Sequence, residues 1–137
     1  MGNCLLISIP ALCAWRENRG GGQAGMRSVV NVLQNRAIKN NTSLYAEATK
    51  KEQFTSISPP PEMKAKESEA DIWPVEGDPQ YAVAEQMVNQ ALACDLTDIT
   101  GGATLYYAAD ASRPDWNFAE LTQTAIIAGQ IFFKVKT

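Results

Sequence analysis

The segment that follows the glycines at 20–22 carries the clearest helical pattern in the chain. Its apolar residues recur at helical spacing, which predicts a helix over residues 25–39. The residues on this apolar face are Met26, Val29, Val30, Leu33 and Ala37. Because a helix of this kind is stabilised mainly by burying its apolar face, the first half of the chain must fold as helices packed on one another.

Glu17 lies between this helix and an apolar stretch, residues 5–15, which we interpret as a second buried helix or its lead-in. A carboxylate at a helix end, next to a glycine-rich loop, can face a cleft. Partial burial raises the pKa of a carboxyl group, so that it can donate a proton near neutral pH, as the cleavage of a glycosidic bond requires. On residue type alone, a solvated helix-end glutamate is the competing interpretation.

The remaining pattern predicts two more helices and a small sheet. Thr42 or Ser43 can cap a helix that runs to about residue 51, and three prolines at 59–61 begin a long loop that reaches residue 77. Asp78 followed by Pro79 predicts the start of a helix over 78–94. Its apolar face comprises Tyr81, Ala84, Met87, Val88, Ala91 and Leu92. Residues 104–107 and 130–135 are typical of strands in a short hairpin-like sheet.

Length and composition exclude several classes of protein. At 137 residues we expect a single domain, 1–137, and a net charge of −3 argues against nucleic acid as a partner. The chain has no histidine, which excludes Ser-His and Cys-His catalysis. Cys4, Cys13 and Cys94 match no zinc or redox spacing, so we expect buried free thiols, no metal site and no cofactor. The apolar N-terminus is too short to span a membrane and lacks the basic start of a signal peptide.

Several short motifs, in order along the chain, resemble the spore-cortex-lytic family of cell-wall hydrolases. The family pattern W-R-E-A-R-G-E-G is similar to residues 15–22, and G-M/Q-x-A-V-x-x-V followed by N-R is similar to residues 25–36. The likeness continues in Gln53-Phe54-Thr55, Trp73-Pro74, Gly77-Asp78, the stretch 98–103, Tyr106-Tyr107 and the stretch 113–116, and spans roughly residues 12–133.

This resemblance implies a mainly helical α+β protein with the lysozyme-like fold of lytic transglycosylases and a small antiparallel sheet near the C-terminus. It implies cleavage of peptidoglycan glycan strands between N-acetylmuramic acid and N-acetylglucosamine, and it places the family's single essential glutamate at Glu17. It also suggests substrate-binding residues: Gln53, Phe54, Thr100, Gly101, Tyr106, Tyr107 and Trp116. For most of these the alternative is structural, as a core aromatic or a turn residue.

Two other functions stay open at this point. Hydrolysis in place of transglycosylation would use a second carboxylate, for which Asp98, Asp110 and Asp115 are the candidates. A non-catalytic glycan-binding relative would fit three departures from the family pattern, in which Gly21 replaces a glutamate and Gln130 and Leu105 replace histidines. We expect a monomer that does not insert stably into membranes. A bare catalytic domain suggests a phage or prophage lysis protein that accumulates in the host cytoplasm and then reaches the periplasm and cell wall.

Overall fold

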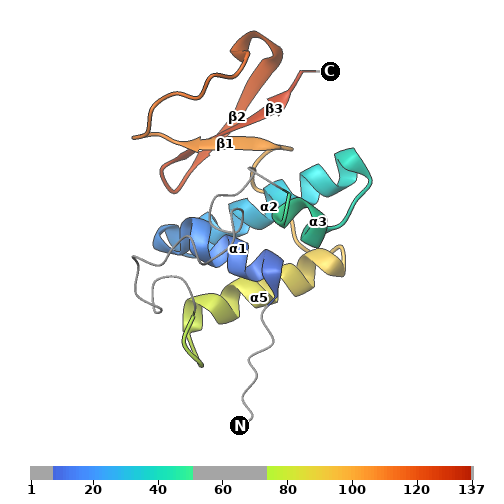
Figure 1. The fold of residues 1–137 in the computed structure, drawn as a ribbon, viewed down its shortest axis with the longest axis vertical. Coiled ribbons are helices and arrows are strands. Elements are labelled where there is room, and N and C mark those ends of the chain that lie inside the picture. The colour runs from blue at the N-terminus through green and yellow to red at the C-terminus, as the bar shows by residue number, and fades with distance from the viewer. Residues whose placement is uncertain (1–7, 51–73, 137) are drawn as a thin grey trace.

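The computed structural model describes residues 8–50 and 74–136, which form a layer of helices with a small sheet packed against it (Figure 1). The helical part comes first in the chain and the sheet last. The elements, in order, are α1 (Ile9–Asn18), the 3₁₀ turn η1 (Arg19–Gly21), α2 (Gly22–Asn40), α3 (Leu44–Ala48), α5 (Pro79–Leu92), β1 (Leu105–Ala108), the 3₁₀ turn η3 (Phe118–Glu120), β2 (Leu121–Ile127) and β3 (Gln130–Val135).

Side-chain caps determine where three of the helices begin. The Ser8 side chain accepts from the amide of Ala11, and the Ser43 side chain accepts from the amide of Ala46. Asp78 accepts from two amides at the start of α5, as its sequence predicts. Each cap satisfies amides that have no partner within the helix, an interaction that stabilises a helix by about 1 kcal/mol. The predicted helices are confirmed with different bounds: α1 extends past residue 15 to Asn18 and so contains Glu17, α2 begins earlier than expected, and α3 ends earlier.

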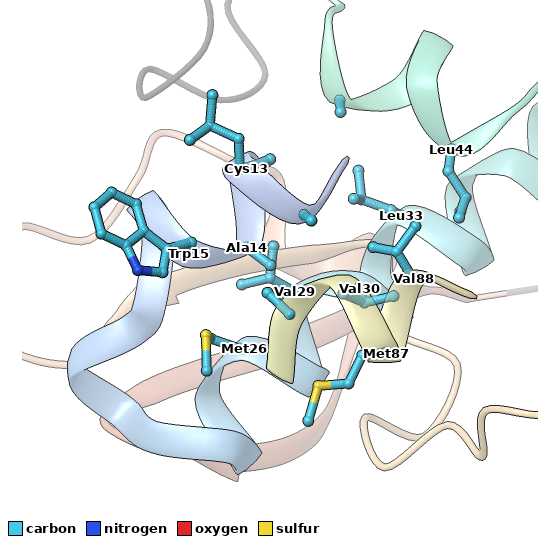
Figure 2. Close-up of a cluster of buried hydrophobic side chains, with 14 of the residues drawn as sticks. Cys13, Ala14, Trp15, Met26, Val29, Val30, Leu33, Leu44, Met87 and Val88 are labelled. Atoms are coloured by element: carbon cyan, nitrogen blue, oxygen red, sulfur yellow. The ribbon is translucent and has the colours of Figure 1, made fainter. Parts of the chain in front are cut away.

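The main core lies where α1, α2 and α5 meet (Figure 2). Its largest side chains are fully buried, and each stabilises the fold by roughly 1.5–3 kcal/mol relative to exposure. They include Leu12, Trp15, Met26, Val29, Val30 and Leu33. The predicted apolar faces are therefore confirmed except at their ends, where Ala37 of α2 is only partly buried and Leu92 of α5 is 66% exposed. Leu92 is the last residue of that helix, and the core does not extend far enough to cover it.

The sheet has three antiparallel strands in the order β1-β3-β2, with β3 in the centre. The antiparallel pairing of the two predicted strands is confirmed, but the hairpin joins β2 to β3 through a turn at Ala128 and Gly129, both with positive φ. Strand β2 was not predicted. A bulge between Gln123 and Ala125 interrupts its register, so its sequence lacks the regular alternation that identifies a strand.

Helix α2 is buried on two sides because it lies between the other helices and the sheet. One side contributes to the main core, while Val32 packs with Ala103 and Phe132 in a second cluster under the sheet.

The cysteine prediction is half right among the described residues, since Cys13 is buried and Cys94 is exposed. Cys4 lies outside the described residues, as does most of the predicted loop up to residue 77. No helix in 8–50 or 74–136 has the length and apolarity that crossing a bilayer requires.

Candidate functional site

Glu17 is the penultimate residue of α1, at the point where that helix gives way to the η1 turn. Its side chain is only partly buried. The Tyr106 hydroxyl, from β1, donates a hydrogen bond to Glu17 Oε1 at 3.0 Å. The other carboxylate oxygen, Oε2, receives no hydrogen bond from the described residues. Among the described residues, the carboxyl group is therefore held at one oxygen, by the sheet.

Two neighbouring groups set the electrostatics around Glu17. Burial raises the pKa of Tyr106 well above its usual value, and the Glu17 carboxylate raises it further, so Tyr106 stays a neutral donor. Arg36, on α2, is buried and donates from Nε to the Thr104 carbonyl at 2.6 Å. Burial lowers the pKa of Arg36, while nearby acidic groups, Glu17 among them, act in the opposite direction.

Gly21, which replaces the second glutamate of the family pattern, is required by packing. A Cβ at this position would lie 2.6 Å from Asn18 Oδ1 and 2.7 Å from the Ala128 Cβ, both closer than real contacts. The tip of the β2–β3 hairpin thus rests on the glycine-rich loop beside Glu17. Asn18, which stands where the family pattern has alanine, is buried and also fills the space against Gly25. In this structure Asn18 and the hairpin occupy the space that a side chain at position 21 would need.

The loop that enters β1 is organised by Asp98. Its carboxylate accepts hydrogen bonds from the Thr100 hydroxyl and amide, the Gly102 amide and the Asn35 side chain, at 2.6–3.1 Å. Burial alone would raise the pKa of Asp98, but these hydrogen bonds outweigh it and leave the pKa below its usual value. Gly101 and Gly102 have positive φ, as a turn of glycines predicts.

The side chain of Thr100 is fully buried and bonded within this loop, which leaves it no free surface for a glycan. Gly101 is exposed at the loop surface. Contact between its backbone and substrate stays a prediction. Four side chains of α2 reach the same loop and fix it to the helix: Arg27 and Asn31 bond to Thr97 and Ile99, and Asn35 and Arg36 bond to Ala103 and Thr104.

Tyr107 and Trp116 lie on the opposite face of the sheet from Tyr106. Adjacent residues of a strand point to opposite faces, so only one of the paired tyrosines can reach Glu17. Tyr107 stacks on Phe133 with centroids 5.8 Å apart, and Trp116 and Phe118 pack edgewise around them. The structure therefore does not bring Tyr107 and Trp116 together with Glu17, and their predicted contact with sugars stays a prediction.

The other predicted site residues, Gln53 and Phe54, lie outside the described residues. Within residues 8–50 and 74–136, no three Cys, Asp or Glu side chains gather as metal ligands would. Sequence reasoning did not identify Arg36 or Asn18 as part of the site. The N-R pair and the W-R-E-N stretch contain them, but only the fold shows that both pack around Glu17 and its loop.

Two solved structures share this fold. The catalytic domain of the germination-specific lytic transglycosylase SleB from Bacillus anthracis has 22% identity and a TM-score of 0.66, over 92% of this chain and 91% of that chain. The catalytic domain of the Bacillus cereus SleB protein has 20% identity and a TM-score of 0.63, over 92% and 87%. They confirm the predicted fold, mainly helical with a small antiparallel sheet.

No curated protein matches the chain. The model of a protein family described as Cell Wall Hydrolase matches residues 20–133, which is most of the chain and begins just after Glu17. This match agrees with the motifs that suggested the family from the sequence. The chain belongs to the cell wall hydrolase family.

Proposed function

We propose that this protein cleaves the glycan strands of peptidoglycan between N-acetylmuramic acid and N-acetylglucosamine, as a lytic transglycosylase with Glu17 as its acid and base. Family membership and the fold shared with the lytic transglycosylase SleB support the substrate and the reaction class. The observation that carries the assignment of Glu17 is its hydrogen bond from Tyr106, which holds one carboxyl oxygen and leaves the other for substrate.

The reaction uses the Glu17 carboxyl group twice, first as an acid and then as a base. Protonated Glu17 gives its proton to the glycosidic oxygen, and the bond from that oxygen to the muramoyl C1 breaks. The resulting carboxylate then takes the proton of the muramoyl C6 hydroxyl, whose oxygen bonds to C1 and closes a 1,6-anhydro ring. Glu17 is protonated again at the end, and no water is consumed.

Tyr106 assists the reaction by orienting the Glu17 carboxyl group. As a neutral donor it fixes the orientation of the carboxyl group, which keeps Oε2 directed at one place through both proton transfers. An oriented acid and base contributes about 10²–10⁴-fold to the rate.

Hydrolysis with a second carboxylate is the weaker alternative. Asp98 is the most buried of the three candidates, and its carboxylate is already occupied by the loop it organises. Asp110 and Asp115 are exposed, in the connection that leads from β1 to the aromatic cluster on the outer face. These placements favour a mechanism with a single glutamate.

The test compares the native protein with Glu17→Gln on purified cell walls. We expect turbidity loss from the native protein and a rate roughly a thousandfold lower from the variant, with an unchanged thermal melt. Glu120→Gln, an exposed glutamate on η3, is the matched control and should behave as native. Equal lysis by native and Glu17→Gln protein would contradict the mechanism.

Mass spectrometry of the released fragments separates the reaction types. Terminal anhydromuramic acid supports transglycosylation, whereas a reducing end would show hydrolysis and reopen the search for a second carboxylate. The role in phage lysis, with passage from the host cytoplasm to the wall, stays a prediction.

A further inference from the structure

The turn that leads into β1 is bonded to helix α2 through the side chain of Asn35. The Asn35 Nδ2 atom donates to the Ala103 carbonyl at 2.9 Å and to Asp98 Oδ2 at 3.1 Å, and more weakly to the Thr100 hydroxyl oxygen at 3.4 Å. Asp98 begins the turn and Ala103 ends it, shortly before β1. One amide group on α2 therefore fixes both ends of the turn at 98–103.

The turn is also bonded internally. Asp98 accepts from the Thr100 hydroxyl at 2.6 Å and from the Gly102 amide at 2.8 Å. The Thr100 hydroxyl oxygen accepts from the Ala103 amide at 3.2 Å. Because Thr100 is fully buried, water does not compete for these bonds. Loss of the bonds from Asn35 is therefore expected to shift the turn as one piece.

Strand β1 begins directly after this turn and depends on it for its position. Thr104 joins the two, since its amide donates to β3 at 3.0 Å and its carbonyl accepts from Arg36 Nε at 2.6 Å. In the described sheet β1 is an edge strand that pairs with β3 alone. A strand with one pairing neighbour is held less firmly than a central one, so the turn contributes more to where Tyr106 lies.

The bond that β1 provides to the catalytic carboxyl group is sensitive to small shifts. The Tyr106 hydroxyl oxygen lies 3.0 Å from Glu17 Oε1, at the long end of the range for such bonds. A shift of β1 by about 0.5 Å would stretch this distance to about 3.5 Å, where little of the bond remains. Displacements of this size at a catalytic group lower the reaction rate.

We propose that Asn35 is a positioning residue for the reaction, whose amide holds the turn at 98–103 so that β1 keeps the Tyr106 hydroxyl on the Glu17 carboxyl group. This inference rests on the proposed function. The bonds of Asn35 go to the turn and not to Glu17 or Tyr106, so it acts on them through the turn and the strand. It follows that Asn35 contributes to catalysis only while residue 106 carries a hydroxyl group.

The first experiment is a double-mutant cycle of Asn35→Ala and Tyr106→Phe. Values of kcat and KM are measured on solubilised glycan strands and expressed per folded molecule. We expect Asn35→Ala to lower kcat about tenfold with KM nearly unchanged, and to lower it less than about twofold when Tyr106→Phe is already present. An unchanged kcat in Asn35→Ala, or the same loss in both backgrounds, would overturn the inference, because Asn35 would then support the fold without acting through the hydroxyl.

Asn40→Ala is the matched control. Asn40 lies on the same helix, and its Nδ2 atom also donates to a carboxylate oxygen at 3.1 Å, that of Glu47, outside the turn. We expect this variant to keep the native kcat. A fall as large as that of Asn35→Ala would assign the effect to α2 as a whole and overturn the inference.

A second variant, Thr100→Val, serves if Asn35→Ala does not fold. It is nearly isosteric and removes from the turn the hydroxyl group that bonds to Asp98 and Ala103. We expect the same dependence on the Tyr106 hydroxyl, with a fall in kcat that largely disappears in Tyr106→Phe. An equal fall in both backgrounds overturns the inference here as well.

An NMR measurement that does not depend on activity separates this inference from the proposed function. The side-chain carboxyl carbon of Glu17 is followed in protein made with isotope-labelled glutamate, and its signal is identified by its loss in Glu17→Gln. We expect Tyr106→Phe and Asn35→Ala to shift this signal in the same direction, and Asn40→Ala to leave it in place. An unmoved signal in Asn35→Ala overturns the inference even where Glu17→Gln abolishes lysis. A moved signal supports it even where Glu17→Gln lyses walls as the native protein does.

Discussion

Tyr106 and Tyr107 are adjacent residues of the same type, yet they belong to opposite faces of the sheet. The inner face, with Tyr106 stacked on Phe132 at 5.3 Å, packs on α2 and delivers a hydroxyl to Glu17. The outer face, with Tyr107, Phe133, Trp116 and Phe118, forms an aromatic cluster of its own. The comparison shows that strand alternation, rather than residue type, decides which aromatic side chain serves the site.

The largest expected effect comes from truncating one phenylalanine on each face of the sheet and comparing the losses of stability and of activity. Phe132 is fully buried between the sheet and α2, so Phe132→Ala should cost about 4 kcal/mol of unfolding free energy and also displace Tyr106. Phe133→Ala should cost about 3 kcal/mol and spare the activity of the molecules that remain folded. Urea unfolding, with wall lysis measured per folded molecule, checks both. Equal losses of specific activity in Phe132→Ala and Phe133→Ala would contradict the distinction between the two faces.

The next effect tests whether the outer face is only structural. Trp116 contacts the rings of Tyr107, Phe118 and Phe133, so Trp116→Ala should cost about 2 kcal/mol, with kcat/KM on cell walls unaltered. Trp116→Phe, which retains a ring, is the control and should recover most of the stability. A clear fall in kcat/KM in a stably folded Trp116→Ala would instead support the predicted stacking of this residue on sugars.

A smaller effect isolates the hydroxyl of the inner tyrosine. Tyr106→Phe retains the ring stacked on Phe132 and removes only the hydrogen bond to Glu17, which is worth about 1.5 kcal/mol to a charged acceptor. We expect kcat to fall about tenfold and the melting temperature to fall by roughly 3–6 °C. Tyr107→Phe is the matched control. The same kcat for Tyr106→Phe and Tyr107→Phe would show that the Tyr106 hydroxyl does not contribute to catalysis.

The smallest effect concerns the loop that leads into β1 and so positions Tyr106. Because the pKa of Asp98 is lowered in the folded state, its stabilising contribution is complete above its unfolded-state pKa, about 3.9. That contribution is lost as the pH falls through the lower folded-state value. Asp98→Asn should therefore be less stable than native at pH 7, by about 1–2 kcal/mol, and the difference should shrink below about pH 4. A difference that is constant between pH 7 and pH 2.5 would contradict this assignment.

Local sequence signals predicted the helices and two of the strands, because each depends on residues close together in the chain. The Ser43 and Asp78 caps and the apolar face of α2 are signals of this kind. Strand β2 was missed because its bulge disturbs the alternation. The exposures of Leu92 and Cys94 were predicted wrongly because burial depends on how far a neighbouring element extends, which local spacing does not record.

The candidate site also combines features that the sequence predicts with features that only the fold shows. The amino-acid sequence by itself determined that Glu17 ends a helix before a glycine-rich loop, and its motifs indicated the cell wall hydrolase family. Only the tertiary structure decided that Tyr106, far along the chain, binds Glu17 while Tyr107 does not. It also showed that Asn18 and Ala128 exclude a side chain at Gly21. These relations depend on packing between a helix and a strand, and the sequence carries no distance between segments that meet only when the chain folds.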